Sequence, residues 1–333
     1  MTFHRRNDEF YFTIHSFECG IGDHLLSWVP VYSLLTELGF VYLHSPLTLY
    51  PFHSTENSQE IGAFLGFDFF PKIRQGLVQE DIPLEEFCHI CMNAESIVDV
   101  REYLFSKNNK AGTVYSFNFK IGAKIRPVLK KLPRLFGCRI NRDLASYYLL
   151  NMQKNHPDIS LRSDKINIVV LVRRGDIAKF KLDNKVFWGT KIHKKYLLIE
   201  EYERELKRVI EQEGMENCHI LIFSDGNRKG VLHLERELEY GRRDDITRED
   251  IYMMKQIDYD KEFDIFKKYR NVNFFISDDF DRFKKAFYAM TCAEIVIGNH
   301  VCDFFRISNY FKINENQRRY CLGPRMNDWT ASL

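Results

Sequence analysis

Long apolar runs, blocks of like charge, glycine and proline are all scarce in this chain. No apolar segment approaches the roughly 20 residues that a membrane-spanning helix needs, and the polar residues 1–9 lead to no cleavage signal. We therefore expect a cytoplasmic protein without a transmembrane segment. The 48 Lys and Arg nearly balance the 46 Asp and Glu, so a general attraction to nucleic acid is not indicated either.

Aromatic residues are abundant by contrast, with 28 Phe and 17 Tyr against 17 Gly and 9 Pro. This composition is typical of a compact globular protein. At 333 residues the chain exceeds the length at which one hydrophobic core stops growing, which predicts two domains. Cys88 and Cys91 form a CxxC without a second pair, so we expect buried thiols there and no zinc site.

The order of apolar and polar segments predicts an α/β fold. The chain opens with a strand over 10–15, a helix over 25–38 and a second strand over 40–44, which together form a βαβ unit. Gly20 and Gly22 lie in the strand-to-helix turn, where backbone N–H groups can approach an anion or a sugar. A third glycine at the dinucleotide spacing is absent, so a tight structural turn also explains the pair.

A polar stretch over 154–165, which contains Pro157, predicts the domain boundary. The sequence over 60–150 has helical and irregular patterns, whereas strand-like and helix-like segments alternate again after the boundary. Parallel strands with helical crossovers are expected of such a pattern. The second half should hold strands over 166–172, 219–224, 272–276 and 294–298, and helices over 196–211, 231–238 and 280–292.

The apolar run 169–172 reads as a buried strand, and it ends in Arg173, Arg174, Gly175 and Asp176. Two guanidiniums at the end of a parallel strand suit a phosphate, because arginine can bond two phosphate oxygens at once. Glycine after the pair lets the backbone turn close to a ligand. The alternative is an arginine pair that only anchors a loop through salt bridges.

Two further strand ends are polar. Ser224 and Asp225 follow one strand, while Gly298, Asn299 and His300 follow another. The carboxyl ends of parallel strands meet at one edge of a sheet, so these residues can line one crevice with the arginines. Helix capping is the alternative explanation for Ser224 and Asp225.

The sequence around 172–176, 223–225 and 293–299 resembles the three motifs of the fucosyltransferase superfamily, which includes α1,2-, α1,6- and protein O-fucosyltransferases. The turn over 20–23 resembles the glycine-rich loop of those enzymes. The resemblance covers the second half of the chain well and the first half thinly. Its arginine motif is the most specific part.

This resemblance implies a GT-B architecture, in which two Rossmann-like domains face a cleft. An acceptor-side domain is expected over 1–155, a nucleotide-sugar domain over 156–303, and a last segment over 304–333 that packs back toward the first. Members of the superfamily are inverting, need no metal or other cofactor, and use GDP-fucose. The reaction expected here is therefore transfer of fucose to a hydroxyl of a glycan or small molecule.

The resemblance also implies roles for single residues. Arg173 would bond the β-phosphate and stabilise the charge on departing GDP. Donor-binding positions would be Gly20, Gly22, Arg174, Asp176, Ser224, Asp225, Gly298, Asn299 and His300. The chain departs from the family at Leu171, where histidine is common, and after Gly298, where serines are common.

A general base is not evident from the sequence. Asp23 and His24 are the preferred candidates, because the first-domain loop would face the acceptor. Asp176, Asp183 and His300 are the others. The DxD at Asp258 and Asp260 has no strand before it, so no metal site is expected there.

Three alternatives to a fucosyltransferase stay open. The first is a glycosyltransferase that uses another nucleotide sugar, and the second is an inactive nucleotide-sugar binding protein of the same fold. A Rossmann oxidoreductase is more distant, because the glycine fingerprint is missing. The acceptor, the linkage formed and the oligomeric state are not predicted by the sequence.

Overall fold

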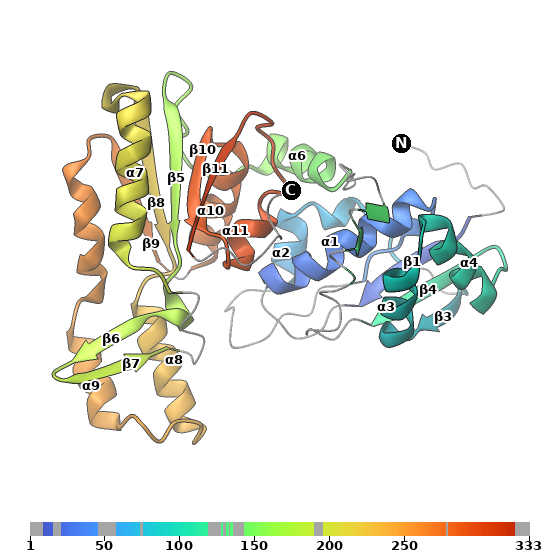
Figure 1. Ribbon diagram of the computed structural model, residues 1–333, viewed down its shortest axis with the longest axis horizontal. Helices are drawn as coiled ribbons and strands as arrows, with labels where there is room; N and C mark the ends of the chain where they lie inside the picture. Colours follow the sequence, from blue (N-terminus) through green and yellow to red (C-terminus); the bar gives the residue numbers. More distant parts are fainter. Residues whose placement is uncertain are drawn as a thin grey trace. The chain divides into compact units, whose positions relative to one another are not determined.

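The computed structural model describes residues 9–15, 21–45, 58–73, 76–118, 128, 131–132, 134–135, 143–189, 196–277 and 279–323. The chain divides between His156 and Pro157 into two compact parts, unit 1 and unit 2. Each unit contains a sheet whose strands pair in parallel, with helices between the strands (Figure 1). The predicted α/β class is therefore confirmed for both parts of the chain.

Unit 1 is built on a four-stranded sheet with the order β2-β1-β4-β3. Its buried core is strongly aromatic, and the Trp28 ring stacks on Tyr32 at 4.8 Å between centroids. Cys88 and Cys91 are buried free thiols in one of its helices, as the sequence predicts. The elements are β1 (Tyr11–His15), α1 (Ile21–Glu37), β2 (Val41–Tyr42), α2 (Ser58–Phe64), η1 (Phe67–Phe69), β3 (Val78–Ile82), α3 (Leu84–Asn93), α4 (Ile97–Lys107), β4 (Thr113–Asn118) and α6 (Asp143–Asn155).

Helix α1 begins earlier than the sequence predicts. It starts at Ile21, so Gly22 and Asp23 belong to the helix and not to a turn before it. The first turn of a helix tolerates both residue types, because its N–H groups need no partner within the helix. The expected glycine-rich turn at 20–23 is corrected to that extent, and Gly20 itself lies outside the described residues.

Unit 2 is built on a five-stranded parallel sheet with the order β11-β10-β5-β8-β9. The elements are β5 (Ile166–Val172), η2 (Gly175–Ile177), β6 (Lys179–Leu182), β7 (Lys185–Trp188), α7 (Ile199–Glu213), η4 (Met215–Asn217), β8 (Cys218–Ser224), α8 (Arg228–Glu239), α9 (Arg248–Gln256), η5 (Tyr259–Lys268), β9 (Val272–Ile276), α10 (Phe280–Cys292), β10 (Ile295–Asn299), α11 (Asp303–Ile307) and β11 (Arg318–Leu322).

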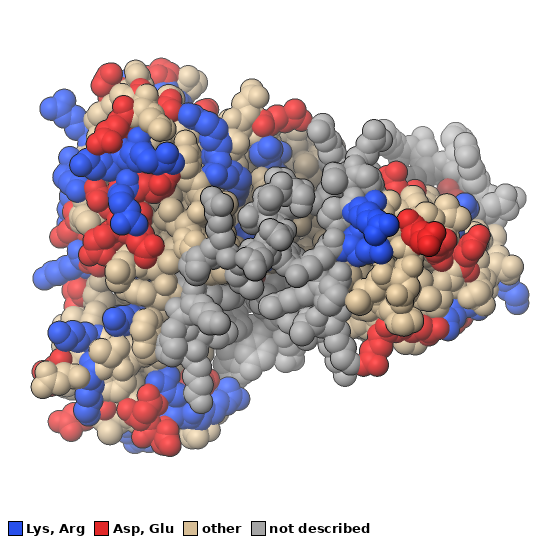
Figure 2. Space-filling view, in the orientation of Figure 1, with Lys and Arg blue, Asp and Glu red and all other residues tan. Residues whose placement is uncertain are grey.

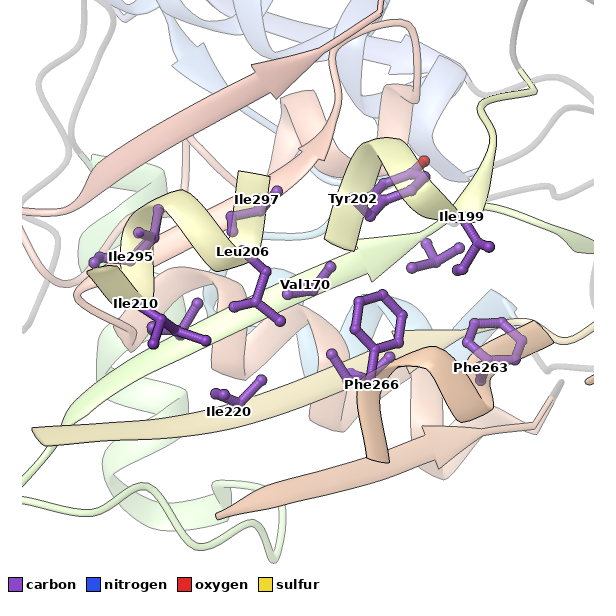
Figure 3. Close-up of a cluster of buried hydrophobic side chains, with 14 of the residues drawn as sticks. Val170, Ile199, Tyr202, Leu206, Ile210, Ile220, Phe263, Phe266, Ile295 and Ile297 are labelled. Atoms are coloured by element: carbon purple, nitrogen blue, oxygen red, sulfur yellow. The ribbon is translucent and has the colours of Figure 1, made fainter. Parts of the chain in front are cut away.

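Both faces of this sheet are covered, which explains why β5 is apolar at nearly every position. Val170 packs with α7 and η5 on one face (Figure 3), and Val169 packs with α10 and α11 on the other. A strand buried on both sides has no polar face to expose. The sheet is thus a rigid support for the loops at its ends.

A smaller layer branches from this sheet. The antiparallel hairpin β6–β7 packs with α8 and α9 around its own buried cluster (Figure 1, lower left). The sequence did not predict this hairpin. Asp183, one of the candidate bases, lies at its turn with φ 54°, so its position is explained by turn geometry.

The segment after β10 adds a strand that the sequence did not predict. β11 pairs in parallel with β10 as the edge strand of unit 2, and its apolar side chains pack against the buried cluster that includes α7. The expected packing of 304–333 toward the first domain stays a prediction. Residues 324–333 lie outside the described residues.

The surface of unit 2 carries both signs of charge. Figure 2 shows Lys and Arg interspersed with Asp and Glu over its visible face. No helix among the described residues is long and apolar enough to cross a bilayer.

Candidate functional site

The connections of unit 2 locate the place where a ligand is expected. From β5 the chain runs through β8 to β9 on one side, and then returns to β10 and β11 on the other. The direction in which successive strands are added to the sheet therefore reverses between β5 and β10, although all five strands are parallel. Open α/β sheets bind ligands outside the carboxyl ends of the strands at such a switch point. Arg173 follows β5 directly, and Asn299 ends β10.

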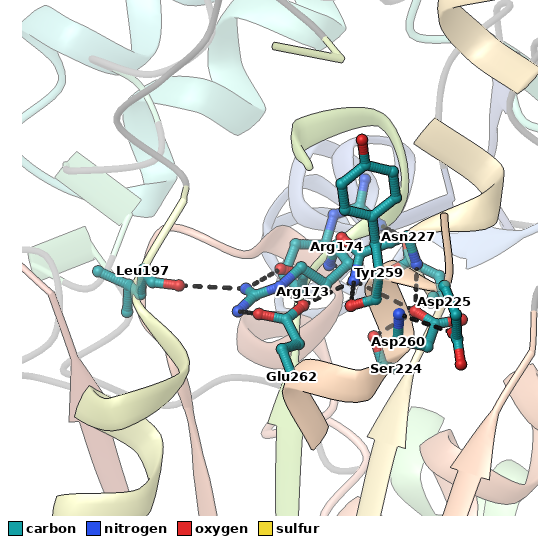
Figure 4. A network of polar contacts seen from close by, with 11 residues as sticks. Arg173, Arg174, Leu197, Ser224, Asp225, Asn227, Tyr259, Asp260 and Glu262 are labelled. Carbon is teal, nitrogen blue, oxygen red and sulfur yellow. Dashed lines mark hydrogen bonds and ion pairs between the residues drawn. The ribbon is translucent and has the colours of Figure 1, made fainter. Parts of the chain in front are cut away.

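Arg174 is an anchor of this edge. Its side chain is 0% exposed, and its Nε and Nη2 donate to the two carboxylate oxygens of Glu262 at 2.6 and 2.8 Å. Its Nη1 donates to the Leu197 carbonyl at 3.1 Å (Figure 4). The guanidinium also lies over the Tyr196 ring. Burial lowers the pKa of Arg174, but Glu262 raises it by more, so the group stays charged.

Arg173 has a different environment. Its side chain is 32% exposed and is paired with Asp176 and, at 2.8 Å, with Oδ2 of Asp225. Burial lowers the pKa of Arg173, and the carboxylates of Asp176 and Asp225 raise it above its usual value. A charged guanidinium that is held by two carboxylates and still reaches solvent can accept an anionic ligand. The salt-bridge interpretation thus describes Arg174, and the phosphate interpretation remains available for Arg173.

Gly175 makes this geometry possible. Its φ is +51°, and a Cβ at this position would lie 2.2 Å from Oδ2 of Asp225. Oδ1 of the same carboxylate accepts from the backbone N–H of Arg174 at 2.9 Å. The predicted close approach of the backbone is present, but the nearest group is Asp225. Any side chain at Gly175 would displace the carboxylate that orients Arg173.

Ser224 and Asp225 do not cap helix α8. The cap residue is Asn227, whereas Ser224 is buried and its Oγ accepts from the Gly226 N–H at 3.1 Å. The helix-capping alternative is therefore wrong for both. Burial raises the pKa of Asp225, but Arg173, Arg282 and Lys229 lower it by more, so its carboxyl is ionised.

The sequence missed the contribution of η5 to this edge. Asn227 donates from Nδ2 to Glu262 at 2.6 Å and from its backbone N–H to Asp260 at 2.8 Å. Asp260, which looked like part of a DxD, therefore accepts hydrogen bonds inside the protein. Glu262 and Arg174 lie 88 residues apart, and no sequence pattern links them. In the sequence, Glu262 is only one carboxylate in a charged stretch.

The residues at the end of β10 contact their own loop. Oδ1 of Asn299 accepts from the Val301 N–H at 3.0 Å, and Nδ1 of His300 lies 2.7 Å from the Leu322 carbonyl. Gly298 leaves space for the ring of Phe305, which a Cβ would meet at 2.3 Å. The structure brings these three residues to the same sheet edge as Arg173. Their contacts are structural.

Asp303 is a further residue that the sequence did not single out. It starts α11, pairs with Arg306 at 3.3 Å, and contributes to the raised pKa of Arg173. Its place after β10 confirms that the ends of β5 and β10 lie near each other.

The preferred base candidates lie in unit 1. Asp23 belongs to α1, and its side chain lies outside the described residues. His24 is 2% exposed, and burial, followed by the charge of His44, lowers its pKa to about 4. An imidazole inside the core does not meet an acceptor from solvent. The structure therefore does not favour His24 as the base.

No group of three or more metal-ligating side chains is found among the residues that the structure describes. The nearby carboxylates Asp176, Asp225 and Glu262 each pair with an arginine instead. Basic side chains thus hold the negative charge of this edge.

Comparison with known proteins gives similarity at the level of solved structures. No family model and no curated protein matches the chain. A mutant of Arabidopsis thaliana FUT1 in complex with GDP is 10% identical with a TM-score of 0.41, covering 96% of this chain and 71% of that chain. POFUT1 in complex with GDP-fucose is 12% identical with a TM-score of 0.42, covering 96% and 99%. E. coli heptosyltransferase WaaC with ADP is 11% identical with a TM-score of 0.35, covering 93% of each chain.

Proposed function

We propose that this protein is an inverting, metal-independent glycosyltransferase. It takes a sugar from a nucleoside diphosphate held at the carboxyl edge of unit 2 and transfers it to a hydroxyl acceptor. GDP-fucose is the first donor to test. In this proposal the units take a GT-B arrangement, with the acceptor bound by unit 1.

One observation carries the proposal. At the switch point of a parallel sheet, a buried arginine bound to Glu262 fixes the turn, and the neighbouring Arg173 presents a partly exposed guanidinium. Arg173 is thus oriented by two carboxylates and can still be reached from solvent. The resemblance of 172–176 to the arginine motif of fucosyltransferases supports the same role.

The chemistry needs stabilisation of the leaving group. When the bond from the anomeric carbon to the phosphate oxygen breaks, negative charge develops on the diphosphate. A guanidinium that is already oriented by Asp176 and Asp225 can bond that oxygen without reorganising. Loss of one such donor typically slows the chemical step about 100-fold or more.

A base must also take the proton of the acceptor hydroxyl. Among the candidates, Asp176 has a side chain that is 19% exposed, so it can reach a bound substrate. Asp176 is paired with Arg173, so in this proposal it suits a positioning role on the donor side better than deprotonation of an acceptor. Asp23 therefore remains the candidate from unit 1.

The first experiment is thermal stabilisation by GDP, UDP, ADP and CMP, each with and without EDTA. A ligand that binds the folded protein raises its melting temperature. A shift that is selective for GDP and insensitive to EDTA would support the proposal. Absence of a shift with every nucleotide at millimolar concentration would overturn it.

Transfer is then assayed with a panel of nucleotide sugars. Arg173→Ala should reduce product formation about 100-fold, whereas Arg173→Lys should retain part of it. A donor other than GDP-fucose that gives product would identify the first alternative. Binding of GDP without hydrolysis or transfer from any donor would identify the inactive binding protein.

A further inference from the structure

Arg173 is one of three basic side chains around the buried carboxylate of Asp225. Arg282 lies in the first turn of α10, where its Nε donates to the Ser277 carbonyl at 2.7 Å. Ser277 in turn donates from its backbone N–H to the carbonyl of Ser224 at 3.2 Å. Arg282 is thereby connected to the residue that precedes Asp225.

Lys229 belongs to another element that packs on the arginine turn. It lies in the first turn of α8, beside Gly230, whose backbone packs so tightly on the arginine turn that a Cβ would lie 2.4 Å from the Gly175 carbonyl. Lys229 and Arg282 both act on Asp225, since their charges help Arg173 to lower the pKa of its carboxyl against the effect of burial. Neither residue belongs to the motifs of the sequence.

The hydrogen-bonding capacity of Asp225 is largely used by other groups. Its Oδ1 accepts from the Arg174 N–H, and its Oδ2 accepts from Arg173. Among the described residues, no carboxylate lies within ion-pair distance of the Lys229 ammonium. A cation held near a diphosphate site without a carboxylate of its own is suited to an anion from solution.

We propose that Lys229 and Arg282 complete the diphosphate site with Arg173, so that three cations from β5, α8 and α10 surround two linked phosphates. Arg173 binds the β-phosphate, whose bond to the sugar breaks, and Lys229 and Arg282 bind the α-phosphate. The identification of the ligand as a diphosphate rests on the proposed function. The positions of the three cations do not.

The arrangement implies selectivity by phosphate number. A nucleoside monophosphate has one anionic group and can engage Arg173 or the pair, but not all three cations together. A diphosphate engages both, and each partly exposed charge-assisted contact is worth about tenfold in affinity. Removing Lys229 or Arg282 should therefore lower the affinity for GDP more than the affinity for GMP.

The test is calorimetric titration of the full chain with inorganic pyrophosphate, inorganic phosphate, GDP and GMP. Lys229→Gln and Arg282→Gln should each weaken pyrophosphate and GDP about tenfold, and should change phosphate and GMP less than about threefold. The matched controls are Arg228→Gln, next to Lys229 on α8, and Lys284→Gln on α10. Each control removes one positive charge from the same helix and should stay within about twofold of wild type.

The outcomes separate this inference from the proposed function. GDP and pyrophosphate bound by both variants as tightly as by wild type would overturn the inference and leave the proposed function standing. Pyrophosphate bound through Lys229 and Arg282, without any nucleotide selectivity, would support the inference and count against the proposed function. Arg282→Lys keeps the charge and should recover pyrophosphate affinity, which a merely structural role for the Ser277 contact would not allow.

Discussion

The five-stranded sheet of unit 2 carries two polar networks. One lies at the amino ends of its strands, the amino edge, and the other at their carboxyl ends, the carboxyl edge. At the amino edge, Asn167 donates from its backbone N–H and its Nδ2 to Glu294 at 2.8 and 3.0 Å. Nδ1 of His219 lies 3.1 Å from Oδ1 of Asn167, and its Nε2 lies 2.9 Å from Nδ2 of Asn273. An Asn273 amide that donates to Nε2 leaves the proton on Nδ1, so the imidazole is neutral.

The carboxyl edge uses the same strands for a different purpose. There the network consists of guanidiniums and carboxylates, and one guanidinium, that of Arg173, reaches solvent. At the amino edge, amides and an imidazole satisfy one another and connect β5, β8, β9 and β10. Polarity at a strand end is therefore a weak indicator of a ligand site. Charge that is oriented and still accessible is a stronger one.

The largest effect is expected from breaking the anchor of the carboxyl edge. Glu262→Gln leaves the buried Arg174 guanidinium without its carboxylate. Breaking a buried ion pair from one side typically lowers the free energy of unfolding by about 3–5 kcal/mol. Urea denaturation of wild type and variant measures this loss.

The matched control for that measurement is Glu205→Gln on α7. Glu205 pairs with Arg208, whose side chain is 53% exposed, so the loss should stay below about 1 kcal/mol. If both variants lost the same free energy of unfolding, Arg174 would have to find another partner and would not be the anchor described here.

The next effect comes from the amino edge. Asn167→Ala removes the side-chain partner of His219 and of the Arg162 N–H, and one of the two N–H groups that residue 167 donates to Glu294. It should cost about 1–3 kcal/mol of unfolding free energy. The rise in melting temperature caused by GDP should be the same as in wild type. A variant that keeps its stability but loses the response to GDP would make the amino edge part of the site.

The contrast between the edges also decides what the sequence can predict. Both ends of the strand β5 are predicted correctly, because it is buried on both faces and therefore almost continuously apolar. β3 was missed because an exposed edge strand of sequence VQEDI has little apolar periodicity. The hairpin β6–β7 was missed although basic and apolar residues alternate over 179–182, because each of its strands has only four residues and the pattern is too short to stand out.

The same limits apply to the candidate site. Arg173 and Asp225 follow strands directly, and Asp176 lies in the short turn after β5, so topology alone brings them to one edge, and the sequence predicted this grouping. Glu262 comes from a 3₁₀ segment far along the chain, and Lys229 from a helix whose start was expected later. Their roles depend on tertiary packing, which a single sequence does not encode as a local pattern.

A smaller effect separates the two edges by pH. The pKa of His219 is lowered, first by burial and then by the charge of Arg162, whereas the pKa of Asp225 is lowered from the much lower range of carboxylates. As the pH falls through the unfolded value of His219, the unfolded chain binds a proton that the folded chain refuses, so folding loses stability. Asp225 contributes no such loss in the range where His219 titrates, because its own loss runs from the ordinary pKa of an unfolded aspartate down to the lowered pKa of the folded state.

The measurement is the free energy of unfolding of wild type and His219→Asn between about pH 7 and about pH 5. The advantage of wild type should shrink toward the acid end, because only wild type carries the titrating imidazole at this edge. The buried His24 also titrates on unfolding, but it is present in both proteins and cancels in the difference. A difference that grows with acidity would mean that the folded state binds the proton, against the neutral network described here.

The smallest change in stability is expected for Asp176→Asn, because the ion pair with Arg173 is partly exposed on both sides and should be worth less than about 1 kcal/mol. Its effect on ligand binding is more informative. The substitution removes a carboxylate that competes with the phosphates for Arg173 and repels them. GDP should therefore bind up to about threefold more tightly in calorimetric titration. Weaker binding of GDP would instead mean that Asp176 contacts the donor, as the resemblance to fucosyltransferases implies. In that case the pairing of Asp176 with Arg173 is an arrangement that the ligand replaces, and the carboxyl edge differs from the amino edge in exchanging its partners.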